Sequence, residues 1–354
     1  MKEKVYFIKA ENTKDVDLAK QIVDVIVKYD MLSFVQKRDM VAVKTHFGET
    51  EKVGVVRPVI LKEIAGLIKK KGGLPFATET SALYKGNRSD AITHMEHANK
   101  MGYDINTIGM PIIMADGLYG DEETEIQIDG EEYKAVSIAS LVSKIQSMVV
   151  VSHFTGHLAA GFGAALKNLG MGLSSRKGKL IQHSTAQPSI KKKKCTSCGV
   201  CLKWCPVDAI TMGSECAVID AKKCIGCGEC LAMCRFDAVV YNWEVTYNDL
   251  QRKITEHAFG AVKACPGKML FINVLTRISK DCDCMPDFEQ IAPDIGVLIS
   301  FDPVAIDAAS LDLVEKALGK PFTESAYDIP YRIQIEHATK IKFGNADYEL
   351  EEIS

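Results

Sequence analysis

Eight of the twelve cysteines in this chain fall into two runs with identical spacing. Each run reads C-x2-C-x2-C-x3-C, and the second repeats the first at a constant offset, from Cys195 to Cys224 and from Cys205 to Cys234. Three thiolates on one loop can hold three corners of an iron–sulfur cubane, while the fourth ligand must come from elsewhere. The spacing therefore predicts two iron–sulfur clusters, which move electrons one at a time.

Both runs resemble the bacterial ferredoxins with two [4Fe-4S] clusters, in which the last cysteine of each run binds the other cluster. This resemblance implies two ligand sets: Cys195, Cys198, Cys201 and Cys234 for the first cluster, and Cys224, Cys227, Cys230 and Cys205 for the second. Arg235 stands where the ferredoxin pattern has proline, whereas Pro206 keeps it. Because proline is not a ligand, the departure concerns the surroundings of one cluster and not its ligation.

Zinc and disulfides are the other common uses of clustered cysteines. Zinc sites use paired C-x-x-C motifs rather than triplets with a trailing cysteine. Disulfide frameworks are typical of short secreted chains, and the apolar stretch in residues 1–8 is too short for an export signal. We therefore expect a cytoplasmic protein, and an anaerobic setting because low-potential clusters are sensitive to oxygen.

A separate pair, Cys282 and Cys284, is divided by a single aspartate. On a strand both thiols would point to one face, and on a turn both could bind one metal ion. The negative charges of Asp281 and Asp283 disfavour reactive thiolates unless a cation lies near. Three interpretations stay open: a structural loop, an additional metal ion or cluster, and a redox-active dithiol.

Polar side chains outside the cysteine runs also suggest a site. Lys44, His46 and Glu49 follow a short strand, where ligands of α/β sheets bind, and could hold an anion and move a proton. Arg57 at the start of the next helix could extend that anion site. A solvated loop is the alternative.

A third group follows the strand that ends near Ser152 and contains His157, Lys167 and, further on, His183. Glycines at 161 and 163 are similar to a phosphate-binding loop, but the full G-x-G-x-x-G pattern is not present.

The elements that must position these residues alternate between strand and helix. Short β-rich runs are separated by stretches with helical periodicity, which predicts an α/β fold with a mostly parallel sheet and helices on both faces. The expected strands are 5–10, 40–44, 74–78, 112–115, 125–128, 148–153, 268–275 and 295–300. The expected helices are 15–29, one that begins at Pro58, 88–101, 249–263 and 303–318.

The cysteine runs interrupt this alternation. We predict one α/β domain in two parts, residues 1–187 and 243–354, with an inserted α+β ferredoxin-like segment at residues 188–242, here called the cysteine module.

Composition excludes several classes of protein. A net charge of −3 over 354 residues provides no basic field for nucleic acid, and the apolar runs are too short to cross a bilayer. A hydrophobic content of 47% is ample for a buried core. The expected partner is a redox protein or a small-molecule substrate, and the sequence does not determine the oligomeric state.

Three passages together resemble the domain-of-unknown-function family 362: Val41–Glu49, Ala164–Gly172 and Asn273–Asp307. The resemblance extends over nearly the whole chain. It implies the inserted module and an anaerobic iron–sulfur protein, and it implies no established reaction.

A fainter resemblance is to the nickel-pincer lactate racemases. His157, Lys167 and His183 follow the spacing of that family's catalytic histidine, cofactor-bearing lysine and metal-ligating histidine, and Arg57 with Pro58 is similar to its substrate loop. The glycine-rich stretch before Lys167 follows the family only loosely.

Three functions follow. In the first, two [4Fe-4S] clusters feed or drain a redox site in the α/β domain. In the second, the protein is a relay or binding protein without catalysis, and in the third it is a racemase- or lyase-like enzyme with accessory clusters. The candidate catalytic residues are His46, Glu49, His157 and Lys167, the candidate cofactor-binding residues are Lys44, Arg57 and His183, and Cys282 and Cys284 are the candidate site of an additional metal ion.

Overall fold

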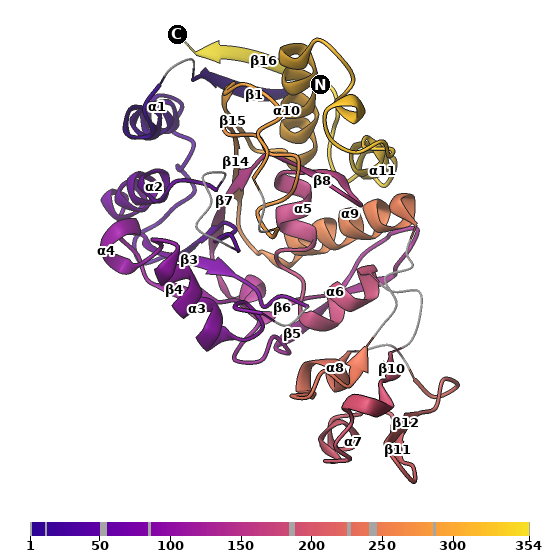
Figure 1. Ribbon diagram of the computed structural model, residues 1–354. Coiled ribbons are helices and arrows are strands. Elements are labelled where there is room, and N and C mark those ends of the chain that lie inside the picture. Colours follow the sequence, from indigo (N-terminus) through magenta and orange to yellow (C-terminus); the bar gives the residue numbers. More distant parts are fainter. Residues whose placement is uncertain are drawn as a thin grey trace.

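The computed structural model describes residues 2–10, 13–49, 55–83, 86–183, 188–224, 228–240, 246–285 and 288–353 (Figure 1). Among the predicted cluster ligands, Cys227 lies outside these ranges. The predicted domain boundaries at 187 and at 242–243 also fall outside them, so the division into domains stays a prediction.

An eight-stranded sheet forms the centre of the molecule, in the order β16-β1-β15-β14-β7-β2-β3-β4. Strand β15 runs antiparallel to both of its neighbours and every other pair is parallel, which confirms the mostly parallel α/β fold. The strands are β1 (Glu3–Lys9), β2 (Met40–Lys44), β3 (Leu74–Glu79), β4 (Ile112–Met114), β7 (Ser147–His153), β14 (Met269–Leu275), β15 (Gly296–Ser300) and β16 (Tyr348–Ile353).

The central strands read as continuous apolar runs because both of their faces are covered. Along β7, Val149 and Val151 join one core, whereas Met148 and Val150 join the other. Alternate side chains of one strand thus hold a layer of helices on each side of the sheet.

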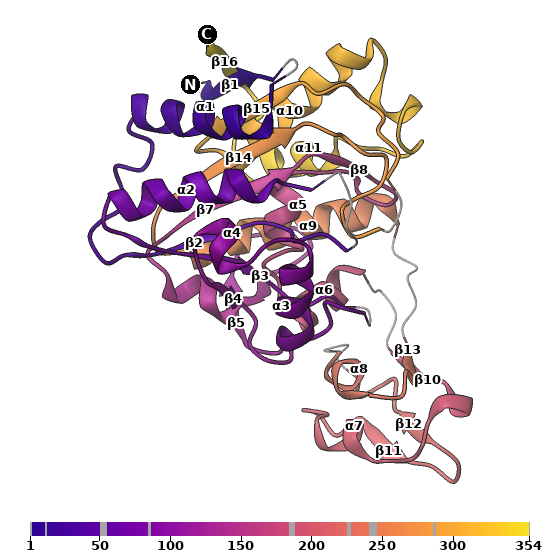
Figure 2. The same cartoon turned by 60° about the vertical axis from the view of Figure 1, so that its left-hand side comes forward.

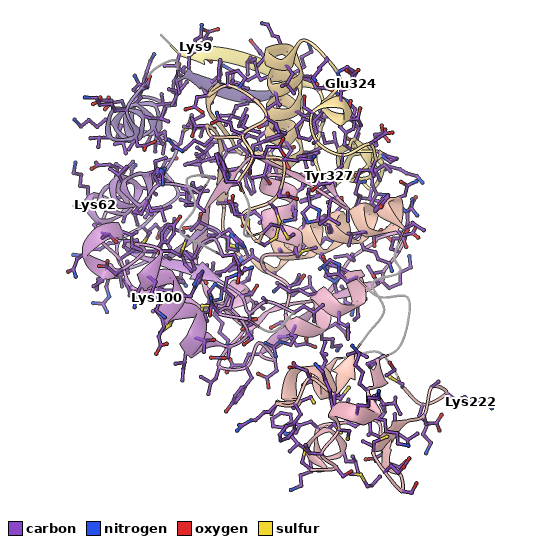
Figure 3. All side chains as sticks on the ribbon, in the orientation of Figure 1. Lys9, Lys62, Lys100, Lys222, Glu324 and Tyr327 are labelled. Carbon is purple, nitrogen blue, oxygen red and sulfur yellow. A yellow bond between two sulfur atoms is a disulfide. The ribbon has the colours of Figure 1, made fainter. Side chains whose placement is uncertain are left out.

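Helices cover both faces (Figures 1 and 2). One core contains side chains of α1 (Asp15–Lys28), α2 (Pro58–Lys70), α3 (Ala91–Lys100) and α4 (Ile105–Ile108). The other contains side chains of α5 (Ala165–Gly170), α9 (Tyr247–Ala264), α10 (Pro303–Leu318) and α11 (Ile333–Lys340). Charged side chains labelled in Figure 3, including Lys62 and Lys100, point outward from this layered body.

Several regions differ from the sequence-based prediction, which also did not include the helices at Ala165–Gly170 and Arg176–His183. The strand expected at 125–128 is β5 (Glu123–Gln127), which pairs with β6 (Ala135–Ala139) in a hairpin separate from the large sheet. Glu256 of α9 accepts hydrogen bonds from the backbone N–H groups of residues 131, 132 and 133, and so fixes the turn of the hairpin. Helix α9 follows the cysteine module in the sequence, whereas the hairpin precedes it. Strand β16 and helix α11 were not predicted, since charged residues conceal their periodicity.

The cysteine module adds no strand to the large sheet in its described residues. It contains α7 (Val200–Lys203), α8 (Glu229–Met233) and two small sheets, formed by β10 (Ser189–Ile190) with β13 (Val239–Val240) and by β11 (Ile210–Met212) with β12 (Ala217–Ile219). In Figures 1 and 2 it projects from the body below α6 (Arg176–His183), with α8 nearer the body than α7.

The remaining elements are short. Strands β8 (Thr155–His157) and β9 (Gly161–Gly163) pair with each other, and 3-10 helices occupy Ser140–Lys144, Lys192–Lys194 and Phe322–Glu324. Over the described residues, the helices are all too short or too polar to cross a membrane.

Candidate functional site

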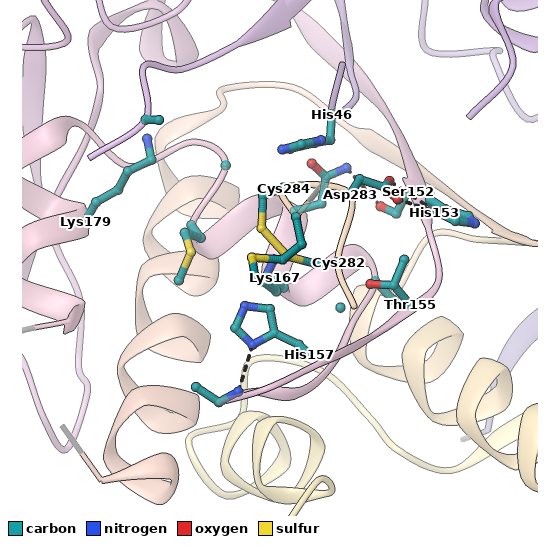
Figure 4. Close-up of a pocket in the computed structure, with 18 of the residues that line it drawn as sticks. His46, Ser152, His153, Thr155, His157, Lys167, Lys179, Cys282, Asp283 and Cys284 are labelled. Atoms are coloured by element: carbon teal, nitrogen blue, oxygen red, sulfur yellow. Dashed lines mark hydrogen bonds and ion pairs between the residues drawn. A yellow bond between two sulfur atoms is a disulfide. The ribbon is translucent and has the colours of Figure 1, made fainter. Parts of the chain in front are cut away.

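A cavity of about 620 Å³ opens at the carboxyl ends of β2, β3, β7 and β14 (Figure 4). In α/β sheets this edge is where ligands usually bind. The polar residues that line it are His46, Glu79, Thr80, Arg88, Ser152, His153, Thr155, His157, Lys167, Asn168, Lys179, His183, Tyr247, Cys282, Asp283 and Cys284. The structure therefore brings the predicted residues His46, His157, Lys167, His183 and the Cys282 pair to one place.

Cys282 and Cys284 form a disulfide on the wall of this cavity. Cys282 is buried, with 5% of its surface exposed, whereas Cys284 is partly exposed. The two sulfurs are bonded to each other in this form, and a metal ion on the reduced pair stays a prediction.

The loop that carries the disulfide is fixed by its acidic residues. The ring of His153 lies 2.9 Å from Oδ1 of Asp283 through Nδ1 and 2.9 Å from the carbonyl oxygen of Thr276 through Nε2. The hydroxyl of Tyr327 donates to the carboxylate of Asp281. The carboxylates of both aspartates beside the sulfurs thus have hydrogen-bond partners.

Close backbone packing holds the same loop against β8. The N–H of Gly156 donates to the carbonyl oxygen of Ser279 at 2.8 Å. A Cβ at position 156 would lie 2.1 Å from the carbonyl oxygen of Lys280, so only glycine permits this approach.

Helix α5 presents Lys167 to the cavity, and a buried carboxylate fixes the start of that helix. Asp307 accepts hydrogen bonds from the N–H groups of Ala165 and Leu166, each at 2.9 Å, and from the amide of Asn273 at 2.8 Å. Burial raises the pKa of Asp307 to about 7, against the effect of these donors. The lysine is therefore held by a rigid helix and not by a loop.

Lys167 differs from the other lysines of the site because its ammonium group has no hydrogen-bond or ion-pair partner within the described part of the chain. Burial lowers its pKa to about 8, while the charges of Asp283 and Glu79 act in the opposite direction. At neutral pH it is a cation that a bound anion, or a thiolate on the same wall, could pair with.

Two histidines near Lys167 are uncharged. Nδ1 of His157 accepts from the N–H groups of Ala159 at 3.1 Å and Ala160 at 2.9 Å, so its single proton lies on Nε2. Burial, and then the charge of Lys167, keeps its pKa well below the usual range. Burial likewise lowers the pKa of His183 to about 3.

His46 lies in a network with Arg88 and Glu49. Nε of Arg88 is 2.6 Å from the carboxylate of Glu49, and Nη1 is 2.9 Å from Nε2 of His46. The N–H of Gly48 donates to Nδ1 of the same ring at 3.0 Å. Burial first, and the charge of Arg88 second, keeps the pKa of His46 well below its ordinary value. Glu49 belongs to this network and is not among the residues that line the cavity.

The other two predicted residues lie behind or away from the cavity wall. Lys44 is fully buried, 2.9 Å from Glu79 and 2.7 Å from Oδ1 of Asn168. Arg57 precedes α2 and is 3.5 Å from the carboxylate of Asp15. Neither is among the described residues that line the cavity.

Sequence reasoning missed several lining residues. Glu79 ends β3 and could have been found by the strand-end rule that identified His46. Lys179 is four residues before His183 on one face of α6, a helical spacing that could have linked the two. Arg88 gave no signal, because its partners Glu49 and His46 are about 40 residues away.

The cysteine runs form two small cavities in the cysteine module. One is lined by Cys195, Cys198, Cys201 and Cys234, and the other by Cys205, Cys224 and Cys230. Burial raises the pKa of the Cys201 thiol, and the neighbouring Cys198, Cys234 and Cys195 thiols raise it further. Each cavity is thus lined by cysteines from both runs. No three His, Cys, Asp or Glu side chains of the described chain converge on a single-ion site.

Two solved structures have similar folds. The lactate racemase apoprotein from Thermoanaerobacterium thermosaccharolyticum matches 77% of this chain with a TM-score of 0.40 and 11% identity. A protein from Thermotoga maritima matches 88% with a TM-score of 0.47 and 8% identity. This chain spans 51% and 59% of the two proteins, respectively.

The sequence itself matches no curated protein. Residues 41–312 match the family described as Domain of unknown function (DUF362), a range that includes every cavity residue and the whole cysteine module. This match confirms the resemblance seen in the sequence, and the chain belongs to the DUF362 family.

Proposed function

We propose that this protein is an iron–sulfur electron-transfer protein in which the cysteine module holds two [4Fe-4S] clusters and exchanges electrons with a redox site in the cavity of the α/β domain. One observation carries the proposal. The seven described cysteines of the two runs line two cavities, each with cysteines from both runs, and one of these cavities lies next to a helix that lines the cavity of the α/β domain.

The residues present suit the clusters. A cubane spreads its thiolates over the corners of the cluster and not around one ion, which agrees with two open cysteine-lined cavities and no single-ion site in the described chain. Cys195, Cys198, Cys201 and Cys234 would hold the first cluster, and Cys205, Cys224, Cys227 and Cys230 the second. Bound there, the clusters would supply one-electron transfer.

Helix α6 connects the second cysteine set with the cavity. Gly228 packs so closely on Leu180 that a Cβ at the glycine would lie 2.6 Å from Cδ2 of the leucine. Lys179 and His183 of the same helix line the cavity. The second set is therefore the one nearer the α/β domain, and the first set is nearer solvent and an external electron donor.

The cavity residues would bind and protonate a small substrate. Lys167 offers a positive charge that has no ion-pair partner in the described chain to an anionic group, and its ammonium can donate a proton. His157 presents an Nε2–H donor to the cavity. A small anionic metabolite is the substrate class that these groups favour.

A racemase- or lyase-like enzyme with accessory clusters is the second candidate. It is supported by one observation, that His157, Lys167 and His183 line the same cavity although they belong to three different elements, β8, α5 and α6. Turnover that continues with oxidised, redox-inert clusters would favour this function over the first.

The test is a metal and sulfide analysis of full-length protein purified without oxygen, with electron paramagnetic resonance after reduction. Two cubanes predict about eight iron and eight sulfide per chain. Cys201→Ser should remove about half of the iron and leave one cluster signal, while Cys216→Ser, at a module cysteine outside both runs, should change neither. Iron content that does not respond to Cys201→Ser would contradict the ligand assignment.

Variants of the cavity distinguish a relay protein from an enzyme. Removal of the His46 and Lys167 side chains should abolish turnover of a metabolite if the cavity is the redox site. Reduction of a partner protein that persists unchanged in this double variant would instead support the relay.

A further inference from the structure

We infer that Cys282 and Cys284 form a redox-active dithiol–disulfide couple, which accepts two electrons from the cysteine module and stores them in the cavity. The inference rests on the proposed function, because it names the group in the α/β domain that takes the electrons. It selects one of the interpretations that the sequence left open for this pair.

The backbone allows the pair to open and close without rearrangement. The two Cα atoms are 5.3 Å apart, inside the usual range for disulfides. The N–H of Met285 donates to the carbonyl oxygen of Cys282 at 2.9 Å, which closes a turn around the pair. With Asp283 bonded to His153 and Asp281 to Tyr327, the loop stays in place while only the sulfurs move.

The two sulfurs differ in access, as a working dithiol requires. Cys284 is partly exposed at the cavity, so it can meet a reactant, whereas Cys282 is buried behind it and can resolve a mixed disulfide. A disulfide that served only to stabilise this loop would contribute little stability, because the two cysteines enclose a single residue. Hydrogen bonds at Asp281, Asp283 and Gly156 already hold the loop in place.

The charges around the sulfurs favour a thiolate after reduction. The carboxylate of Asp283, between the two cysteines, is held by the ring of His153 at 2.9 Å. Lys167 lines the same cavity as the disulfide (Figure 4), has no partner of its own in the described residues, and interacts with the charge of Asp283, the residue between the two cysteines. A cation in this position stabilises the thiolate and can return a proton to it.

The electron count of the couple matches the cysteine module. Reduction breaks the S–S bond, consumes two electrons and two protons, and leaves two S–H groups. Each reduced [4Fe-4S] cluster supplies one electron, so two clusters supply the pair; Lys167 gives one proton and cavity water the other. The couple thereby converts one-electron delivery into a two-electron reductant for a substrate in the cavity.

Helix α6 connects the second cysteine set with the cavity that contains the disulfide. Leu180 of α6 touches Gly228 beside the second cysteine set, and His183, one turn later on the same helix, lines the cavity with the disulfide. The second cluster would therefore be the immediate donor.

The test is an anaerobic reductive titration of full-length, cluster-loaded protein with a photoreduced deazaflavin as the one-electron donor. The native protein should take up about four electrons per chain, two in the clusters and two in the disulfide, against about two for the Cys282→Ser/Cys284→Ser double variant. Alkylation after the titration should place two labels on the peptide that contains residues 282–284, and none before it. Cys216→Ser is the matched control and should behave as the native protein.

A second variant tests the route. Cys224→Ser, which removes a ligand of the second cluster, should slow labelling of the Cys282 peptide by about tenfold or more while Cys216→Ser does not. The proposal of a redox couple is overturned if native protein with loaded, reducible clusters takes up only two electrons per chain. It is also overturned if the native protein holds a metal ion that the double variant loses. Those outcomes leave the iron–sulfur proposal intact, whereas protein that never assembles clusters overturns both.

Discussion

The cysteine module and the α/β domain are stabilised in different ways. In the α/β domain, two extensive cores on opposite faces of the sheet bury whole strands and helices. In the described residues of the module, the buried core cluster comprises Ile210, Ala217, Cys230 and Val239, packed against partly buried cysteines and aliphatic side chains. So small a core rarely folds without a metal or disulfides. The difference teaches that the α/β domain is stabilised by its own packing, whereas the module would need the proposed clusters for its stability.

The two regions also encode their chemistry differently. All eight predicted cluster ligands lie between residues 195 and 234, so their relation is visible in local spacing. The cavity collects side chains from the ends of β3 and β7, from the segment after β2, from β8, α5, α6 and α9, and from the loop at residues 282–285, which only the folded chain brings together.

The largest expected effect comes from removing the proposed clusters. If the fold of the module is coupled to metal binding, chelation under oxidising conditions should unfold the module and leave the α/β domain folded. Limited proteolysis followed by mass spectrometry should then find cleavage within 188–240 and none in the strands of the large sheet. Anaerobically kept, loaded protein is the control. If the stripped module resists protease as well as the loaded module does, the module does not depend on the clusters for its fold.

Loss of Asp307 should affect the opposite region. Asp307→Ala removes the acceptor of the first two N–H groups of α5 and of Asn273, and should lower the free energy of unfolding by about 2–4 kcal/mol in urea denaturation. Iron content should stay unchanged. Asp347→Ala, at the surface, is the control, and an equal loss there would contradict this role.

The same carboxyl gives the α/β domain a dependence on pH. Because the native pKa is about 7 and the unfolded value is 3.8, the native state binds more protons between these limits. Stability should therefore fall as the pH rises from about 4 to about 7. Asp307→Asn should remove that slope, which denaturation at several pH values would detect.

The sequence predicted those features that depend on neighbours along the chain. Periodicity located the central strands, and the Asp302-Pro303 pair marked the start of α10, where Asp302 accepts from Val304 and Ala305. Strand-end position selected His46, and spacing selected the cysteines.

Pairings across the fold could not be predicted in the same way. His153 and Asp283 are 130 residues apart, and nothing near either one indicates the other. The β5–β6 hairpin leaves the large sheet because Glu256, beyond the inserted module, fixes its turn. Lys44 and Glu49 are residue types that binding sites often use. In the structure, however, Lys44 forms an ion pair with Glu79, and Glu49 forms one with Arg88.

The smallest effect concerns two cavity lysines, Lys167 and Lys179, whose pKa values burial lowers alike, to about 8. Lys179 donates to Thr80 and to the carbonyl oxygen of Ser174, whereas Lys167 has no such partner in the described chain. Lys167→Met should therefore stabilise the protein at pH 7, by on the order of 2 kcal/mol. Lys179→Met should stabilise less or destabilise, because it leaves buried acceptors unpaired.

The pH dependence gives the sign of this last effect. Between pH 8 and 10.5 the unfolded chain keeps the proton that native Lys167 has lost, so the native protein gains stability as the pH rises through this window. The advantage of Lys167→Met should shrink accordingly, from its full value at pH 7 to nearly zero above pH 10, in urea denaturation series of both proteins. An advantage that does not change with pH would mean that packing, and not the buried charge, sets the cost. Lys167 thus carries a charge that has no partner in the described chain and that destabilises the fold at neutral pH. Such a cation is suited to binding an anion in the cavity.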